Sequence, residues 1–280
     1  MAAERISVLD TVGEAVRFAR TGRRAAIVPL TLGAVFGMAS LMGQYTAHPA
    51  LALLSILQIL SSIMAVSAML QGALPGAPEQ SSPPQPPRLG GLQWGMNEWR
   101  LTGSIALLAL VFALMAALGI FIAAAMLMSS GSIQAIGALR PGLTQEDLVR
   151  VLGPQRMEAL ALLYLAFTLV ALWIWVRLSL YAPATIASRT VAVFDSWGLT
   201  RGRFWPMFFV ILLTFLPSFT VWFVVGGLQG ALGGRADGTV SLPLAVMLAA
   251  LASGVASFVQ LPLSTGAYFA LYRRLSHRGR

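Results

Sequence analysis

The sequence predicts an all-α fold, a polytopic transmembrane helical bundle in which the chain crosses a bilayer six times. Three observations lead to this class. Of the 280 residues, 57% are apolar and only 10% are charged, whereas about a quarter of a globular domain is charged. Long charge-free stretches divide the chain, and a helix needs about 20 such residues to cross a bilayer. The arginines gather in alternate connections between these stretches.

The first predicted element is a surface helix over residues 7–20. Its apolar residues recur at helical spacing on one face, and its charged residues lie mostly off that face. The apolar set is Val8, Leu9, Val12, Val16 and Ala19. We expect this helix to lie in the plane of the membrane surface.

The membrane spans follow from the charge-free stretches. The first stretch, residues 25–78, is too long for one helix and contains turn residues around His48 and Pro49, so we divide it in two. None of the stretches alternates apolar and polar residues as a barrel strand does. The predicted spans are residues 25–43, 49–74, 101–128, 158–181, 205–232 and 242–272.

The arginine distribution predicts the orientation. With the N-terminus inside, fifteen of the 19 basic residues fall on the inner side. The positive-inside rule then places both termini in the cytoplasm. All basic residues are arginine, which is typical of a GC-rich genome and favours a bacterial inner membrane. A cleaved signal peptide is the alternative for the first span, but no convincing small-x-small cleavage site precedes His48, and apolar sequence resumes at once.

Two connections have a composition of their own. Residues 75–91 are rich in proline and are predicted to form a solvated cytoplasmic linker; partner binding through its PxxP-like pattern is the less common alternative. Residues 129–157 form the predicted periplasmic loop. Within that loop, Thr144 begins an N-cap pattern for one short helix that ends at Gly153 and Pro154.

Composition excludes most catalytic chemistry. There is no cysteine and only two histidines, so thiolate or histidine-rich metal centres are excluded. There is no lysine for a phosphate-binding loop, no Gly-x-Ser-x-Gly elbow, and the ten carboxylates are scattered. We therefore expect no enzymatic activity, metal or cofactor. The net charge of +9 borders apolar runs, which favours membrane lipids with anionic headgroups as partners and not nucleic acid.

One candidate site lies at the predicted inner membrane surface. Guanidinium groups bind phosphate, and tryptophan rings favour the headgroup level. The candidate lipid-phosphate and interfacial residues are Arg177, Trp197, Arg201, Arg203 and Trp205. The alternative is that they only anchor the fifth span and that Arg177 extends its charge to the interface.

A second candidate site lies inside the fifth and sixth spans. Proline removes a backbone hydrogen bond and favours a kink, and broken helices line solute sites in transporters. The possible solute-lining residues are Pro217, Gln260, Pro262 and Ser264. Hydrogen bonding between helices is the alternative for the polar ones. Glycines four residues apart, such as Gly33 and Gly37, suit helix packing, either within the chain or with a homo-oligomer or another membrane protein.

The segments Arg177-Leu-Ser-Leu-Tyr-Ala-Pro-Ala184 and Asp195-Ser-Trp-Gly-Leu-Thr-Arg-Gly-Arg-Phe-Trp205 carry a family resemblance. They resemble a pattern of an uncharacterised bacterial six-helix membrane protein family akin to the membrane domain of glycerophosphoryl diester phosphodiesterases. Gly198 departs from that pattern, which commonly has a basic residue there. The resemblance implies a multi-pass inner-membrane protein, and the catalytic barrel of the phosphodiesterases has no counterpart in this sequence.

The sequence therefore predicts a non-catalytic membrane protein that acts through lipid or protein contacts, in membrane organisation or as a companion subunit. The alternative is a small-solute or lipid transporter that uses kinked fifth and sixth spans.

Overall fold

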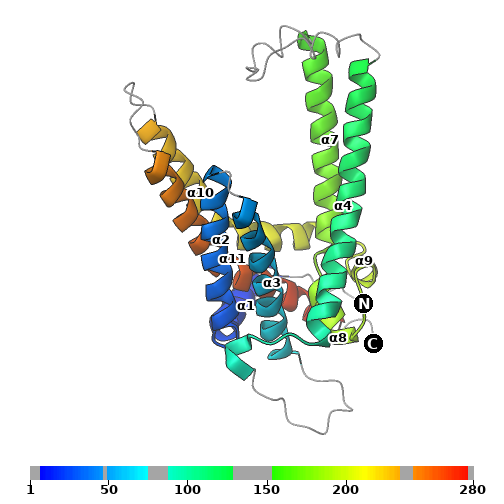
Figure 1. Ribbon diagram of the computed structural model, residues 1–280. Helices are drawn as coiled ribbons and strands as arrows, with labels where there is room; N and C mark the ends of the chain where they lie inside the picture. The colour runs from blue at the N-terminus through cyan, green and yellow to red at the C-terminus, as the bar shows by residue number, and fades with distance from the viewer. Residues whose placement is uncertain (1–6, 47–48, 75–87, 129–152, 234–241, 277–280) are drawn as a thin grey trace. The chain divides into compact units, whose positions relative to one another are not determined.

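A computed structural model describes residues 7–46, 49–74, 88–128, 153–233 and 242–276 (Figure 1). These residues are mostly helical and contain no β-strand, which confirms the all-α class for the described part. Five helices are long and apolar enough to cross a membrane. They cover Leu53–Gln71, Met96–Met126, Pro154–Ser188, Phe204–Val224 and Met247–Ser276, and a shorter apolar helix covers Ile27–Ser40.

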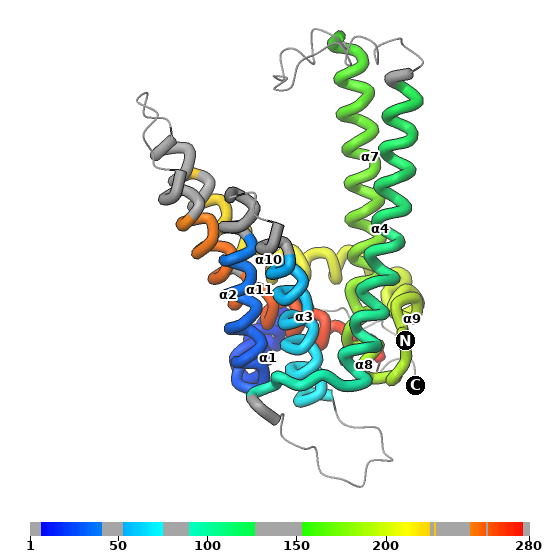
Figure 2. The backbone as a smooth tube through the Cα atoms, in the orientation of Figure 1, coloured from blue at the N-terminus to red at the C-terminus, as the bar shows by residue number. Residues whose placement is uncertain are grey.

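The elements follow one another along the chain as ten helices in the described residues (Figure 2). They are α1 (Val8–Ala25), α2 (Ile27–Thr46), α3 (Pro49–Gln71), the 3-10 helix η1 (Arg88–Gly91), α4 (Met96–Met128), α7 (Pro154–Leu178), α8 (Tyr181–Ser188), α9 (Asp195–Leu199), α10 (Phe204–Gly233) and α11 (Leu242–Ser276). The chain divides into two compact units, one of Met1–Ser104 with Arg177–Arg280 and one of Ile105–Val176.

Helix α1 packs antiparallel to the C-terminal half of α11 in the first unit. The ring of Phe18 stacks on that of Phe269 with centroids 4.9 Å apart. At Gly266 the two backbones approach so closely that a Cβ atom would lie 2.6 Å from the carbonyl oxygen of Ala15. Glycine at position 266 therefore permits this contact.

The face of α1 that is buried in the protein coincides only in part with the predicted apolar face, since Ala19 belongs to both. The buried residues are Thr11, Ala15, Phe18 and Ala19, whereas Leu9 is 77% exposed. The helix is also longer than the predicted residues 7–20, since it continues to Ala25. The expectation was incomplete because it considered only the apolar periodicity of the segment and not the small and aromatic residues that fit against α11.

Helices α2 and α3 form an antiparallel pair against α11. The hydroxyls of Ser40 and Ser55 hydrogen-bond across the pair at 2.5 Å. Farther along, Gly37 faces the side chain of Gln58, and Gly254 of α11 faces Met38. Small residues at these contacts let membrane helices pack closely.

The last four residues of the predicted linker form a short 3-10 helix, which the proline-rich composition did not predict. Residues Arg88–Gly91 form η1, and Gly90 and Gly91 have φ values of +60° and +90°. Gly91 packs against the backbone of Ala25 and the side chain of Ala68, where a side chain of its own would not fit. Residues 75–87 lie outside the described part of the chain.

The predicted fourth span, residues 158–181, differs from the structure at both ends. The observed helix begins at Pro154 because proline is favoured at the first helical position, so Pro154 starts α7. It ends at Leu178 because Pro183 has no N–H for the carbonyl of Ser179, and α8 begins after this break. The predicted short helix near Thr144 lies outside the described residues.

The second unit is a pair of antiparallel segments from α4 and α7. Gly119 faces the ring of Phe167, whose nearest atoms would lie 3.3 Å from a Cβ at that glycine. No described residue of Ile105–Met126 or Pro154–Trp175 is buried. Apolar helices that expose side chains on all faces are expected where lipid is the solvent.

The last two predicted spans agree closely with α10 and α11. Pro217 lies inside α10 and Pro262 inside α11, and both helices continue without interruption through their proline. The predicted span 242–272 is extended to Ser276 in α11.

Candidate functional site

The first predicted site lies on the connection from α7 to α10. Arg177 is in the last turn of α7, and α9 places Ser196 and Trp197 beside it. A turn follows in which Gly202 has a φ of +74°, a left-handed conformation that favours glycine. No atom lies within 4 Å of a Cβ built on Gly202, so its conformation and not lack of space requires glycine there.

Two buried hydroxyls attach α9 to the end of α7. Ser196 Oγ donates to the carbonyl oxygens of Val193 at 2.6 Å and Arg177 at 3.3 Å. Thr200 Oγ1 donates to the carbonyl oxygens of Trp197 at 3.1 Å and Arg177 at 3.4 Å. The last carbonyls of a helix have no partner within the helix. These hydroxyls satisfy the carbonyl oxygen of Arg177 and hold α9 beside it.

The Arg177 side chain lies over the ring of Trp197. Its Cζ atom is 5.6 Å from the ring centroid, within the range of a cation–π interaction. The Nε and Nη1 atoms of Arg177 are buried, and Trp197 is 37% exposed. We call Arg177, Ser196, Trp197 and Thr200 the Arg177–Trp197 corner. In this corner the positive charge of Arg177 lies next to the partly exposed ring of Trp197.

The other three predicted residues follow the corner in sequence. Arg201 is exposed and Arg203 is half-buried in the turn before α10. Trp205 is 65% exposed and packs on its aromatic neighbours in the first turns of α10. Those neighbours are Phe204, Phe208 and Phe209. Of the predicted residues, the described ring contacts thus bring Arg177 and Trp197 together. The ring contacts of Trp205 are with the three phenylalanines of α10.

The second predicted site joins α10 to α11 through one hydrogen bond. Ser218 Oγ donates to Oε1 of Gln260 at 2.5 Å. Nε2 of Gln260 is buried and has no hydrogen-bond partner among the described residues. Ser264 is buried and donates to the carbonyl oxygen of Gln260 at 2.9 Å. Pro262 is buried, but Pro217 is on the exposed side of α10.

A buried carboxylate at the start of α4 was not among the predicted site residues. Glu98 is 2% exposed and accepts hydrogen bonds from the backbone N–H of Gly95 at 2.7 Å and from Nε2 of Gln71 at 3.1 Å. Gln71 also donates to Ser67. A glutamate three residues after the N-cap typically closes back on it, so the spacing of Gly95 and Glu98 was the available signal. No local sequence pattern indicated the contact with Gln71, which is 27 residues away.

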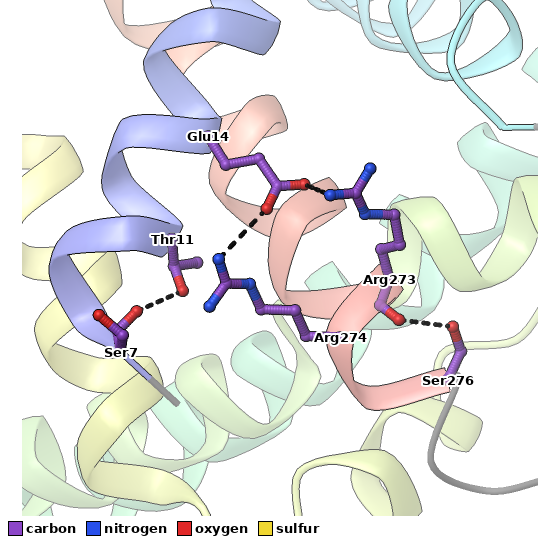
Figure 3. Close-up of polar contacts among 6 residues, drawn as sticks. All are labelled: Ser7, Thr11, Glu14, Arg273, Arg274 and Ser276. Atoms are coloured by element: carbon purple, nitrogen blue, oxygen red, sulfur yellow. Dashed lines mark hydrogen bonds and ion pairs between the residues drawn. The ribbon is translucent and has the colours of Figure 1, made fainter. Parts of the chain in front are cut away.

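The structure also joins the two ends of the chain. Glu14 of α1 pairs with Arg273 and Arg274 of α11 at 2.5 Å and 3.4 Å (Figure 3). The sequence showed these arginines only as part of the inner positive charge. No local pattern connects residues so far apart in the chain.

The inventory of the described residues contains no group of three or more histidine, cysteine, aspartate or glutamate side chains that could hold a metal ion. Comparison with known proteins adds no relative: no family model, no curated protein and no solved structure matches this chain.

Proposed function

We propose that this chain is a non-catalytic multi-pass protein of a bacterial inner membrane, and that its Arg177–Trp197 corner binds the phosphate groups of anionic lipids. In this role it acts in membrane organisation or as a companion subunit of another membrane protein. The observation that carries the proposal is the guanidinium group of Arg177 held over the Trp197 ring at 5.6 Å. Guanidinium groups recognise phosphate oxygens through charge and planar N–H donors.

The number of crossings in this proposal is six. Five helices are long enough by themselves, and five crossings between Leu53 and Ser276 leave these two residues on opposite sides. However, Glu14 contacts the C-terminal end of α11, and Gly91, after α3, packs against Ala25. The start of α2, the end of α3 and the end of α11 thus share one side. These contacts support a sixth crossing, by α2.

The proposed orientation places these shared ends in the cytoplasm. The support is the excess of arginine in the connections on that side, which include residues 1–24 and 177–203. Helix α1 is proposed to lie at the membrane surface while it packs on α11, since the large apolar side chain of Leu9 is exposed on a helix that carries charged residues along its length. We also propose that the chain is related to the membrane domain of glycerophosphoryl diester phosphodiesterases. The support is the sequence motif that contains the residues of the Arg177–Trp197 corner.

A lipid-retention experiment tests the lipid-phosphate proposal. The full chain is purified from membranes, and retained phosphatidylglycerol is measured by mass spectrometry in Arg177→Gln and Trp197→Ala variants. We expect both to retain less lipid, with a loss of about two- to five-fold for Trp197→Ala, since a cation–π contact contributes about 0.5–1 kcal/mol at an exposed site.

The matched control for this experiment is Arg156→Gln. Arg156 lies on the same helix as Arg177 but in its first turn and is exposed, and the substitution removes the same charge. Equal retention in Arg156→Gln and Arg177→Gln would show that only net charge matters and would reject the corner as a lipid site.

A small-solute or lipid transporter is the second candidate function. The observation that favours it is Nε2 of Gln260, a buried donor with no hydrogen-bond partner in the described residues, located on a candidate membrane span. An unsatisfied amide within a membrane is costly, and a solute oxygen is one possible partner. Flux through liposomes that is lost in Gln260→Leu and kept in Gln58→Leu would support this function. Absence of flux for ions, sugars, amino acids and lipids alike would reject it.

A further inference from the structure

Glu14, Phe18, Phe269, Arg273 and Arg274 form a group that we call the terminal cluster. Figure 3 shows the Glu14 carboxylate between the guanidinium groups of Arg273 and Arg274, which approach it from two sides. The glutamate comes from α1 and both arginines come from the last turn of α11. One carboxylate therefore faces two full positive charges.

A single carboxylate satisfies this pair of arginines poorly. The Arg273 contact to Oε1 is a close ion pair, but Oε1 receives no hydrogen bond from any described residue. The hydrogen bond from Arg274 to Oε2 measures 3.4 Å, whereas charge-assisted bonds of this kind are about 2.7–2.9 Å. A group with more oxygens and more negative charge, such as a phosphate, would engage both arginines better.

The position of Arg273 does not depend on Glu14 alone. Its Cζ atom lies 5.9 Å from the centroid of the Phe269 ring, and that ring stacks in turn on Phe18. The side chains of Arg273 and Arg274 are 53% and 29% exposed, whereas that of Glu14 is only 13% exposed. An anion from outside can thus reach both arginines while the aromatic stack keeps Arg273 in place.

The terminal cluster lies where a charge-free stretch ends. Residues 238–272 carry no charge, and Arg273 follows directly. If α11 crosses the bilayer, the first arginine after such a stretch is at the level of the lipid phosphates.

We propose that Arg273 and Arg274 form a binding site for a phosphate group, in which the carboxylate of Glu14 is an internal competitor. The site is separate from the Arg177–Trp197 corner and shares with it only the membrane location. The phosphate belongs to a lipid headgroup or is free in solution, since both present the same oxygens to the guanidinium groups.

The experiment measures phosphate binding to the full chain in nanodiscs. One arm compares retention of phosphatidylglycerol in mixed discs, and the other titrates inorganic phosphate into discs of neutral phosphatidylcholine. Glu14→Gln removes the competitor, and we expect it to strengthen binding by about two- to five-fold, the factor that corresponds to a partly exposed ion pair of about 0.5–1 kcal/mol. Arg273→Gln and Arg274→Gln are expected to weaken it.

Two controls match the charge changes. Asp10→Asn adds the same net charge as Glu14→Gln on an exposed position of the same helix, and Arg17→Gln removes one charge from an exposed position of α1. Arg274→Lys keeps the charge without the planar fork, and weaker binding in this variant supports recognition by the fork while it guards against loss of folding in the glutamine variants.

The outcomes separate the possibilities. A change in the lipid arm alone identifies a headgroup, and a change in the phosphate arm alone identifies a soluble phosphate. Equal effects of Glu14→Gln and Asp10→Asn, or unchanged binding in both arginine variants, overturn the proposal. Loss of lipid in Arg177→Gln with no effect at the terminal cluster would leave the proposed function standing and reject this site alone.

Discussion

At the scale of single residues, the hydroxyl of Ser196 links α9 to the end of α7 by a hydrogen bond. It is fully buried and donates to the carbonyl oxygens of Val193 and Arg177. A buried acceptor that loses its donor raises the free energy of the folded state. The carbonyl oxygen of Arg177 still accepts a hydrogen bond from the hydroxyl of Thr200, so removal of the Ser196 hydroxyl leaves it with one of its two side-chain donors.

We therefore predict that Ser196→Ala lowers the free energy of unfolding by about 1 kcal/mol. The measurement is thermal unfolding of the purified chain in detergent. Ser188→Ala is the control because Ser188 is exposed and bonds only to nearby Thr190 in the described hydrogen bonds. Equal midpoints for the two variants would contradict this prediction.

Gly202 allows a comparison of two exposed glycines. Its φ of +74° is unfavourable for any residue with a Cβ atom, whereas Gly198 lies within α9. Gly202→Ala is expected to destabilise the protein by about 1–2 kcal/mol, and Gly198→Ala is expected to be neutral or stabilising. Both are free of steric contact, so thermal unfolding reports the backbone effect directly. Similar destabilisation by both would show that this turn does not keep its left-handed conformation.

At the scale of elements, the contact between α1 and α11 depends on Gly266. A Cβ there would lie 2.6 Å from the carbonyl oxygen of Ala15, too close for the two backbones to stay in place. We predict that Gly266→Ala separates the helices and costs about 1–3 kcal/mol, as overpacking does. Reduced protection of α1 in hydrogen exchange checks this.

Gly13→Ala provides the matched control for the Gly266 prediction. Gly13 lies on α1 itself, and nothing is within 4 Å of its Cβ position. Alanine at this exposed helical site is expected to stabilise the helix by about 0.4–1 kcal/mol. If protection of α1 fell equally in both variants, the close approach at Gly266 would not be what holds the helix.

Periodicity and charge predicted the long helices well, because an apolar run between arginines has few other structures available. The predicted span 205–232 differs from α10 by one residue at each end, and the predicted span 242–272 lies inside α11. The break after Leu178 was missed although Pro183 signals it, since the apolar run continues past both residues. The motif residues Arg177 and Trp197 were identified, and the structure supplies their contact.

What the sequence could not show are the contacts between distant elements. Glu98 and Gln71 are 27 residues apart, and Glu14 and Arg274 are 260 apart. Each of these side chains is a common surface residue in its local context. Only the packing of α1 on α11 and the approach of α4 to the end of α3 bring them together.

At the scale of the whole molecule, six crossings predict that both chain ends are accessible from the same side. The chain has no cysteine, so a single introduced cysteine reports one position. Asp10→Cys and Ser276→Cys are expected to react with an impermeant maleimide only from the cytoplasmic side, and Gln155→Cys only from the outside. Reaction of Asp10→Cys and Ser276→Cys from opposite sides would contradict the six crossings.

The pairing of Glu14 with Arg273 and Arg274 also has a consequence for synthesis. Because α1 is synthesised before α11, it meets this partner only after α11 has been made. Until then, the carboxylate of Glu14 and the ring of Phe18 have no partner on α11. A chain that stops before α11 therefore leaves these two side chains of α1 uncovered.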